Sequence, residues 1–265
     1  MKHPLDGARF KVIRAQEHLD CLKSEVGMYL DTQPHEVRSQ PQRRPQHTWL
    51  PSTHVLPTIV PGEPSPRLSI IIGDCVTNAR AALDYLMWEL AARFFNPPLD
   101  IDKRPRDKTL AAFPIFDNPH KKSFKDDRFN SLAKRKVPAH AITELKRVQP
   151  HNAGYEPLLW LQTLVNRDKH RTLLLTTGEF DQMTVELSPW PLYDLMRESR
   201  NITIPRNLTT EKQPALQSDV QMKGKVAIYV TWKDVPVPRE SVEMTLEKIV
   251  KCVVQIIPRF DRFLI

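Results

Sequence analysis

The stretch SPRLSIIIGDCVTNARAALDYLMWEL, Ser65 to Leu90, decides the fold of this chain. Its apolar residues recur every three or four positions, which is the spacing of one buried face of an α-helix. Pro66 suits the first turn of a helix, and the NPP sequence that begins at Asn96 stops it. We therefore expect a long helix over residues 67–96 whose apolar face packs against other helices.

Three further segments have the same periodicity and complete a helical core. They lie within residues 6–32, 138–171 and 239–263, and the last should kink at Pro258. Residues 33–66 form a proline-rich excursion that excludes a long helix or a central strand. Within this excursion, HEVRSQ and THVLP can form short edge strands.

Strand-like patterns gather in residues 172–235, before the last helix. TLLLTT and QMTVELS flank Gly178 as the two strands of a hairpin would, and KVAIYVTW alternates its side chains between two faces. The fold class that follows is α+β and mostly helical: a four- to five-helix bundle with a small antiparallel β-sheet inserted before the C-terminal helix. We expect one domain over residues 1–265.

The formal net charge of +8 is concentrated in one segment. Residues 101–171 hold 16 Lys and Arg against 8 Asp and Glu, a surplus equal to that of the whole chain. The part of this segment before residue 138 is broken by prolines and is expected to be irregular. A basic patch suits nucleic acid, nucleotide phosphates or an acidic partner, although many basic surfaces bind no ligand.

The apolar runs and short motifs limit location and chemistry. The longest aliphatic run, Leu68–Ile72, is too short to span a bilayer, and the first ten residues have no apolar core of signal-peptide length. We therefore expect a cytoplasmic protein with no membrane partner. The sequence has no phosphate loop, no GxSxG and no HExxH motif, and only seven glycines, so neither a cofactor nor a metal is expected.

Polar residues flank the apolar face of the helix predicted over residues 67–96. Asp74 and Asn78 share one stripe, and Arg80 precedes Asp84 by four positions, a spacing at which the two can form an ion pair. Gly73 costs about 1 kcal/mol relative to Ala in a helix interior, which indicates close packing by a neighbouring helix or a ligand. If these polar residues are only structural, Arg80 and Asp84 form an ion pair on the surface and Asn78 forms a hydrogen bond to another helix.

The sequence NRDKHR, Asn166–Arg171, ends the helix predicted within residues 138–171. Asp168 falls on the buried face, where a carboxylate needs a cation, and Arg80 or another Lys or Arg is a candidate partner. The three residues after Asp168 are explained equally well as cations that complement the free carbonyls and the dipole of a helix C-terminus.

Two interpretations of these polar residues stay open. In the first they form an inter-helix cluster that binds RNA or a nucleotide-like anion, and that could cleave it if His170 moves a proton, Asp168 orients His170, and Arg80 or Lys169 steadies an anion. In the second they form a buried network of hydrogen bonds and ion pairs that fixes helix register in a non-catalytic interaction protein. The first interpretation gives candidate catalytic roles to His170, Asp168 and Arg80, and binding roles to Asp74, Asn78, Asp84, Asn166, Lys169 and Arg171.

The stretches IGDCVTNARAALDYLMWEL, FPIF, QPHNAGYEPLLWL and LQTLVNRDKHRTLL resemble an uncharacterised family of bacterial proteins of actinobacterial type. The family pattern has a helix with GD-x3-N-x-R-x-A-L-D and a second motif, N-x-D-K-H-R. The resemblance covers mainly Arg67–Leu175. The chain departs from the pattern at Thr77 and Tyr85, where the family has histidines.

An Arg-x4-His pair on one helix of a helical core is similar to the HEPN group of helical bundles, many of which are metal-independent ribonucleases that work as dimers. The corresponding stretch here is Arg80–Tyr85, which lacks the histidine that would act as the base. The resemblance implies that His170 serves instead or that this chain does not cleave RNA. It also implies a homodimer as a partner, beside RNA or a nucleotide.

Overall fold

The computed structural model describes residues 3–32, 35–42, 54–100, 102–103, 105–117, 122–170, 175–179, 183–187, 202–204, 222–225 and 228–264. The chain divides into two compact units. The helical unit consists of Met1–Gly27, Ser65–Leu175 and Trp232–Ile265, and the strand unit of Met28–Pro64 and Thr176–Thr231. The single domain expected over residues 1–265 stays a prediction.

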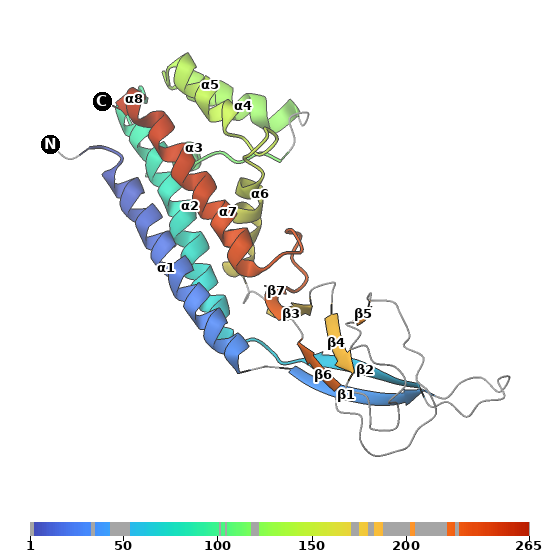
Figure 1. Ribbon diagram of the computed structural model, residues 1–265. Helices are drawn as coiled ribbons and strands as arrows, with labels where there is room; N and C mark the ends of the chain where they lie inside the picture. Colours follow the sequence, from blue (N-terminus) through green and yellow to red (C-terminus); the bar gives the residue numbers. More distant parts are fainter. Residues whose placement is uncertain are drawn as a thin grey trace, which may run out of the picture. The chain divides into compact units, whose positions relative to one another are not determined.

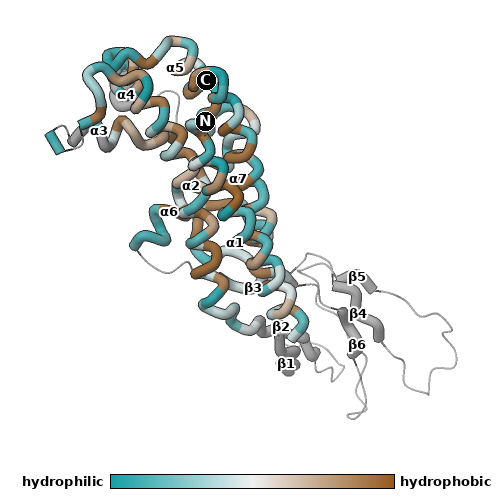
Figure 2. Tube along the Cα trace, turned by 90° about the vertical axis from the view of Figure 1, so that its left-hand side faces the viewer, coloured by the Kyte–Doolittle hydropathy of each residue, from teal (hydrophilic) through white to brown (hydrophobic). Residues whose placement is uncertain are grey.

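The core of the helical unit is formed by α1 (Asp6–Asp31), α2 (Pro66–Phe94), α6 (Pro157–Asp168) and α7 (Val242–Ile256). α2 contacts both α6 and α7, and α6 contacts α7. α1 runs beside α2 (Figure 1), and apolar positions recur along the helices (Figure 2). The helical bundle predicted from the sequence is therefore confirmed. None of the helices in the described ranges is both long and apolar enough to cross a bilayer.

The burial of α2 follows from the spacing of its apolar residues. Ile72, Leu83 and Leu90 are fully buried, and each such side chain contributes about 1.5–3 kcal/mol relative to an exposed position. The helix begins where predicted, because the Ser65 hydroxyl accepts a hydrogen bond from the N–H of Arg67 at 3.3 Å. α2 is thus the central helix against which the others pack.

The C-terminal helix changes geometry where the sequence predicted a kink. α7 ends at Ile256 and is followed by a 3₁₀ turn, η1 (Ile257–Phe260), and by the short helix α8 (Asp261–Leu264). The turn contains Pro258, which has no N–H for an α-helical hydrogen bond. The predicted break of the α-helix at Pro258 is therefore present as a 3₁₀ turn, and a kink of the helix axis stays a prediction.

Two helices occur where an irregular stretch was expected: α3 (Pro105–Leu110) and α4 (Lys122–Lys134). The prediction was wrong because a short helix needs only a few apolar residues when neighbouring segments cover them. In α4, Phe129 is 6% exposed and Leu132 is fully buried. α5 (Ala139–Arg147) follows as predicted and contacts both α4 and η1.

The strand unit contains the short strands predicted in the proline-rich excursion. β1 (His35–Gln42) pairs antiparallel with β2 (His54–Pro61). In a second sheet, β4 (Met183–Leu187) lies between β5 (Ile202–Ile204) and β6 (Met222–Lys225), and both pairings are antiparallel. The small antiparallel sheet expected before the C-terminal helix is confirmed.

The predicted hairpin around Gly178 is not formed. β3 (Leu175–Glu179) pairs with β7 (Ile228–Trp232), whereas β4 belongs to the sheet with β5 and β6. The alternation of side chains indicates that a segment is a strand, but tertiary context decides its partner, which explains the error. The alternation within β7 is confirmed at its end, where Val230 and Trp232 are buried.

Candidate functional site

Arg80 and Asp84 of α2 hold the backbone of the segment that follows α3. Arg80 donates to both carboxylate oxygens of Asp84, at 3.1 and 2.9 Å, and to the carbonyl of Phe113 at 2.8 Å. The N–H of Phe113 donates to Asp84 at 2.8 Å. Arg128 donates to the carbonyl of Ala112, and burial together with the charge of Arg80 lowers the pKa of Arg128 to about 10. The predicted ion pair is therefore confirmed, and both of its groups bind one stretch of backbone.

The FPIF sequence, Phe113–Phe116, is also held by Gln149, which is 1% exposed. The Gln149 amide donates to the carbonyls of Pro114 and Leu145, at 3.0 and 2.8 Å. Its side-chain oxygen accepts from the N–H of Phe116 at 3.0 Å. Arg80, Asp84 and Gln149 thus fasten the segment around Phe113 to α2 and to the end of α5.

Asn78 joins α2 to α1. Lys11 of α1 donates to the side-chain oxygen of Asn78 at 3.2 Å, and the amide of Asn78 donates to the carbonyl of Asp74 at 2.9 Å. Lys11 also lies 6.0 Å from the ring centroid of Tyr85, within the range of a cation–π interaction. The interhelical hydrogen bond predicted for Asn78 is confirmed.

α6 passes close to Gly73 of α2. A Cβ at this position would lie 2.6 Å from Oδ1 of Asp168, so the close packing predicted from the glycine is confirmed. Burial raises the pKa of Asp168, and the carboxylate of Asp74 raises it further. Among the described residues no cation bonds to Asp168, and Arg80, its candidate partner, binds Asp84 instead.

The remaining candidate residues lie around the end of α6. The helix ends at Asp168 rather than at residue 171, and Asn166, Lys169 and His170 are exposed. Arg171 lies outside the described residues.

The structure brings the candidate residues together in two separate pairs. Arg80 bonds to Asp84, and Asp168 lies against Gly73, near enough to Asp74 for the two carboxylates to repel each other. At a rise of 1.5 Å per residue, Asp74 and Asp84 are about 15 Å apart along α2. In the described part of the chain, no group of three or more His, Cys, Asp or Glu is placed to hold a metal ion.

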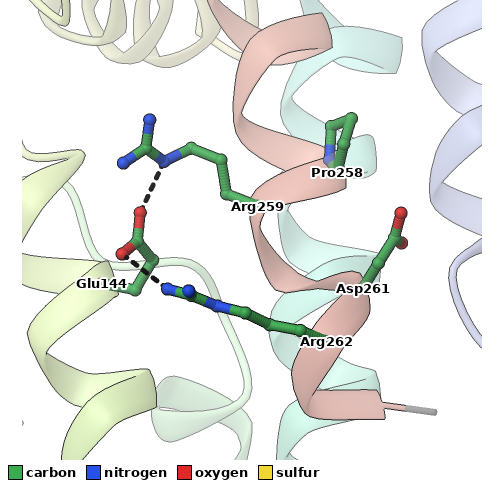
Figure 3. A pocket seen from close by; sticks show the side chains of 5 residues that line it. All are labelled: Glu144, Pro258, Arg259, Asp261 and Arg262. Carbon is green, nitrogen blue, oxygen red and sulfur yellow. Dashed lines mark hydrogen bonds and ion pairs between the residues drawn. The ribbon is translucent and has the colours of Figure 1, made fainter.

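A further polar cluster, which was not predicted, lies between α5 and the C-terminal turn. Glu144 of α5 is 2% exposed, and its carboxylate accepts from Arg259 at 2.5 Å, from Arg262 at 3.2 Å and from Arg147 at 3.5 Å. Figure 3 shows Arg259 and Arg262 reaching toward the two oxygens of Glu144. We call these four residues the arginine cluster. A buried carboxylate needs such compensation, because its desolvation is costly.

The arginine cluster borders a recess of about 420 Å³. Arg259 and Arg262 have side chains that are 41% and 64% exposed, so part of each guanidinium meets solvent. The hydrogen bond to Glu144 raises the pKa of Arg259, which keeps that group charged. Asp261 also lines the recess but points away from Glu144 (Figure 3), and Arg9 donates to it at 2.8 Å. The lining therefore has two arginines and two carboxylates, each carboxylate already paired with an arginine.

The sequence contained a signal for this cluster. Glu144 lies on the buried face of α5 with Ala141 and Leu145, the same pattern that marked Asp168 as a carboxylate in need of a cation. Arg259 and Arg262 are three positions apart, which places them on one side of a helical turn. The meeting itself could not be predicted, because Glu144 and Arg259 are 115 positions apart.

The chain matches no protein-family model, and comparisons with curated proteins and with solved structures find no match. The resemblance to the bacterial family and to the HEPN group therefore stays an expectation.

Proposed function

We propose that the helical unit binds a phosphate-bearing ligand, RNA or a nucleotide, at the arginine cluster. One observation carries the proposal: three guanidinium groups bond to a single buried carboxylate, and two of them, those of Arg259 and Arg262, line a recess. Three positive charges against one negative charge leave a surplus of two. A surplus of this kind attracts anions, and Glu144 and Arg147 belong to the basic segment of residues 101–171.

The chemistry of arginine supports a phosphate ligand. A guanidinium has five N–H donors in a planar fork that matches phosphate oxygens, and each arginine uses one nitrogen on Glu144. The other N–H groups of these arginines are therefore left beside Glu144, where they can donate to a bound anion. Glu144 contributes by holding the guanidinium groups near one another before a ligand arrives, which lowers the entropic cost of binding.

The motif residues of α2 have a different role in this proposal. Arg80 and Asp84 are committed to each other, as the structural interpretation expected, and also to Phe113, which was not predicted. Asp74 and Asp168 bring two carboxylates together, and these would repel phosphate. These contacts support a ligand site at the arginine cluster, with the α2 network holding the position of the segment around Phe113.

A second candidate function is metal-independent RNA cleavage at the end of α6. It is favoured by the raised pKa of Asp168, which bonds to no cation among the described residues, and by the exposed His170 two positions later. Incubation of the protein with total cellular RNA without added metal tests it. Cleavage that is lost in His170→Ala supports this function, and an intact RNA profile with the wild-type protein rules it out.

The main proposal is tested by fluorescence anisotropy with a labelled single-stranded RNA and with a labelled nucleotide. Replacing Arg259 and Arg262 by Gln should weaken binding about tenfold or more, since each hydrogen bond to a charged group contributes about 1.5–3 kcal/mol. The slope of log K against log salt should become shallower as well.

Arg14→Gln is the matched control for these variants. It removes one positive charge, as each of the single variants Arg259→Gln and Arg262→Gln does, but from an exposed pair with Glu17 on α1 that does not line the recess. Binding by Arg259→Gln and by Arg262→Gln that equals binding by Arg14→Gln would contradict the proposal. Thermal unfolding of each variant shows whether the fold is retained.

A further inference from the structure

We infer that the ligand of the arginine cluster is a single strand of RNA rather than a free nucleotide, and that successive phosphates of the strand contact exposed cations along α5. The inference rests on the proposed function, because it names the ligand class for the same site. It follows from the position of the positive charges, since these extend beyond the recess.

The exposed charges around α5 are positive. Between Ala133 and His151 the chain has five Lys and Arg and a single acid, Glu144, which is 2% exposed. Of the five cations, Arg135 pairs with the buried Asp107, and the other four are exposed. Together with two exposed arginines of the C-terminal turn, these four form what we call the α5 surface: Lys134, Lys136, Lys146, Arg147, Arg259 and Arg262.

The α5 surface keeps a positive surplus when the carboxylates of the recess are counted in full. Glu144 accepts from three of its arginines, and Asp261 lines the recess beside it. Six positive charges less these two carboxylates leave a surplus of four, without counting Arg9, which donates to Asp261. One phosphate group cannot neutralise this surplus, because a monoester has at most about two negative charges. Several phosphates of one strand can.

The cations lie at both ends of α5, too far apart for one phosphate group. Lys134 and Lys136 precede the helix, whereas Lys146 and Arg147 belong to its last turn. At a rise of 1.5 Å per residue, the nine residues of α5 span about 13 Å. A stacked strand has a phosphate about every 3.4 Å along its axis, so about four phosphates pass along this length. Only the two arginines of the C-terminal turn line the recess, so a nucleotide bound there leaves the other four cations unused.

An aromatic pair lies beside these cations and favours RNA over an acidic protein. His140, in the first turn of α5, is exposed, and its ring centroid lies 5.1 Å from that of Phe263. The guanidinium of Arg262 covers the same ring, at 4.8 Å from the centroid. Unstacked bases of RNA pack on aromatic rings and on arginine planes, whereas an acidic peptide has no base to place there.

The experiment uses the full chain and a labelled adenosine octanucleotide, with fluorescence anisotropy as the readout. Unlabelled adenosine oligonucleotides of two, four and eight nucleotides compete with it, and their affinity should rise up to a length of about four. Adenosine monophosphate should compete at least about tenfold more weakly than the octanucleotide, or not at all, because it lacks the additional phosphate contacts. The slope of log K against log salt for the octanucleotide should be about −3, from about −0.7 for each of four contacts.

The double variant Lys136→Gln with Lys146→Gln removes one cation from each end of α5, and neither residue lines the recess. It should bind the octanucleotide several-fold more weakly, with a salt slope that is shallower by about 1.4. Arg14→Gln with Lys23→Gln is the matched control, because it removes two positive charges from exposed ion pairs on α1. The control should bind the octanucleotide as the wild type does.

Four results would overturn the inference. Equal affinities of the octanucleotide and the monophosphate, both lost in Arg262→Gln, refute it and leave the proposed function intact. Octanucleotide binding that is the same in the α5 double variant and in its control places the strand elsewhere on the protein. Polyglutamate that competes as well as the octanucleotide assigns the α5 surface to an acidic protein. No binding of either the octanucleotide or the monophosphate refutes both the inference and the proposed function.

Discussion

Replacing Gly73 by Ala tests the packing of α2 against α6. In an open helix this change should stabilise the protein by about 1 kcal/mol, because Ala is the better helix former. Here the new Cβ would lie 2.6 Å from Oδ1 and 2.9 Å from Oδ2 of Asp168. Insertion of a methyl group into occupied space costs about 1–3 kcal/mol of stability. We expect about 1–2 kcal/mol here, because the Asp168 carboxylate can rotate away from the new methyl group. The gain in helix propensity and the cost of overpacking together predict a net effect between no change and about 1 kcal/mol of destabilisation.

A double-mutant cycle separates the two contributions. In an Asp168→Ala background the carboxylate is gone, and Gly73→Ala should stabilise the protein by about 1 kcal/mol. The coupling energy between the two positions is then about 1–2 kcal/mol. Gly27→Ala in α1 is the matched control, because a Cβ there meets nothing within 4 Å and should stabilise the protein in both backgrounds.

The assay is urea unfolding followed by far-UV circular dichroism, with the four proteins of the cycle compared at one pH. The midpoint of unfolding reports the change in stability as long as the slope with urea is constant. If Gly73→Ala stabilises the wild type as much as Gly27→Ala does, Asp168 does not lie against Gly73 and the crossing of α2 and α6 is not as described.

Two further predictions concern polar groups of the helical unit. Asp168→Asn should raise the thermal midpoint at pH 7. Burial and the carboxylate of Asp74 raise the pKa of Asp168, so folding favours the protonated carboxyl group. The stability that is present below the unfolded pKa of about 3.9 is therefore lost as the pH rises through the folded pKa, and asparagine avoids this loss. The advantage should vanish in melts below about pH 4, and a lower midpoint at pH 7 would contradict this reasoning. Gln149→Leu should lower the unfolding free energy by about 2–4 kcal/mol in urea titrations, because the N–H of Phe116 and a carbonyl of the same segment lose their partner. Gln16→Leu is the control, because Gln16 hydrogen-bonds only to the exposed carboxylate of Asp20, and it should change the unfolding free energy by no more than about 0.5 kcal/mol. If the two variants had equal effects, Gln149 would not hold the FPIF sequence.

Much of the helical core could be predicted because helix periodicity is a local property. The seam from Leu68 to Leu90 is buried as its spacing indicated, and the break at Pro258 follows from a missing N–H. The helix α4 and the pairing of β3 were not predicted. Both depend on what lies beside them: neighbours cover the few apolar residues of α4, and β7 supplies the partner of β3.

For the candidate site residues too, local features could be predicted and tertiary contacts could not. Arg80 and Asp84 were paired correctly, because a spacing of four on one helix brings two side chains together in any tertiary context. Asp168 was recognised as a carboxylate turned toward another helix, but its neighbour is Gly73 with Asp74 and not Arg80. Periodicity gives the direction of a side chain around its own helix and gives no information about what it meets.

By itself, the sequence determined which faces of the helices are apolar, where α2 begins, and which polar residues share a turn, since each depends on residues within a few positions of one another. Only the tertiary structure decided that Glu144 meets Arg259 and Arg262, which are 115 and 118 positions away. The physical reason is that burial of the apolar faces sets the height and the angle at which helices pack. The charged side chains then meet whatever groups that packing brings within reach.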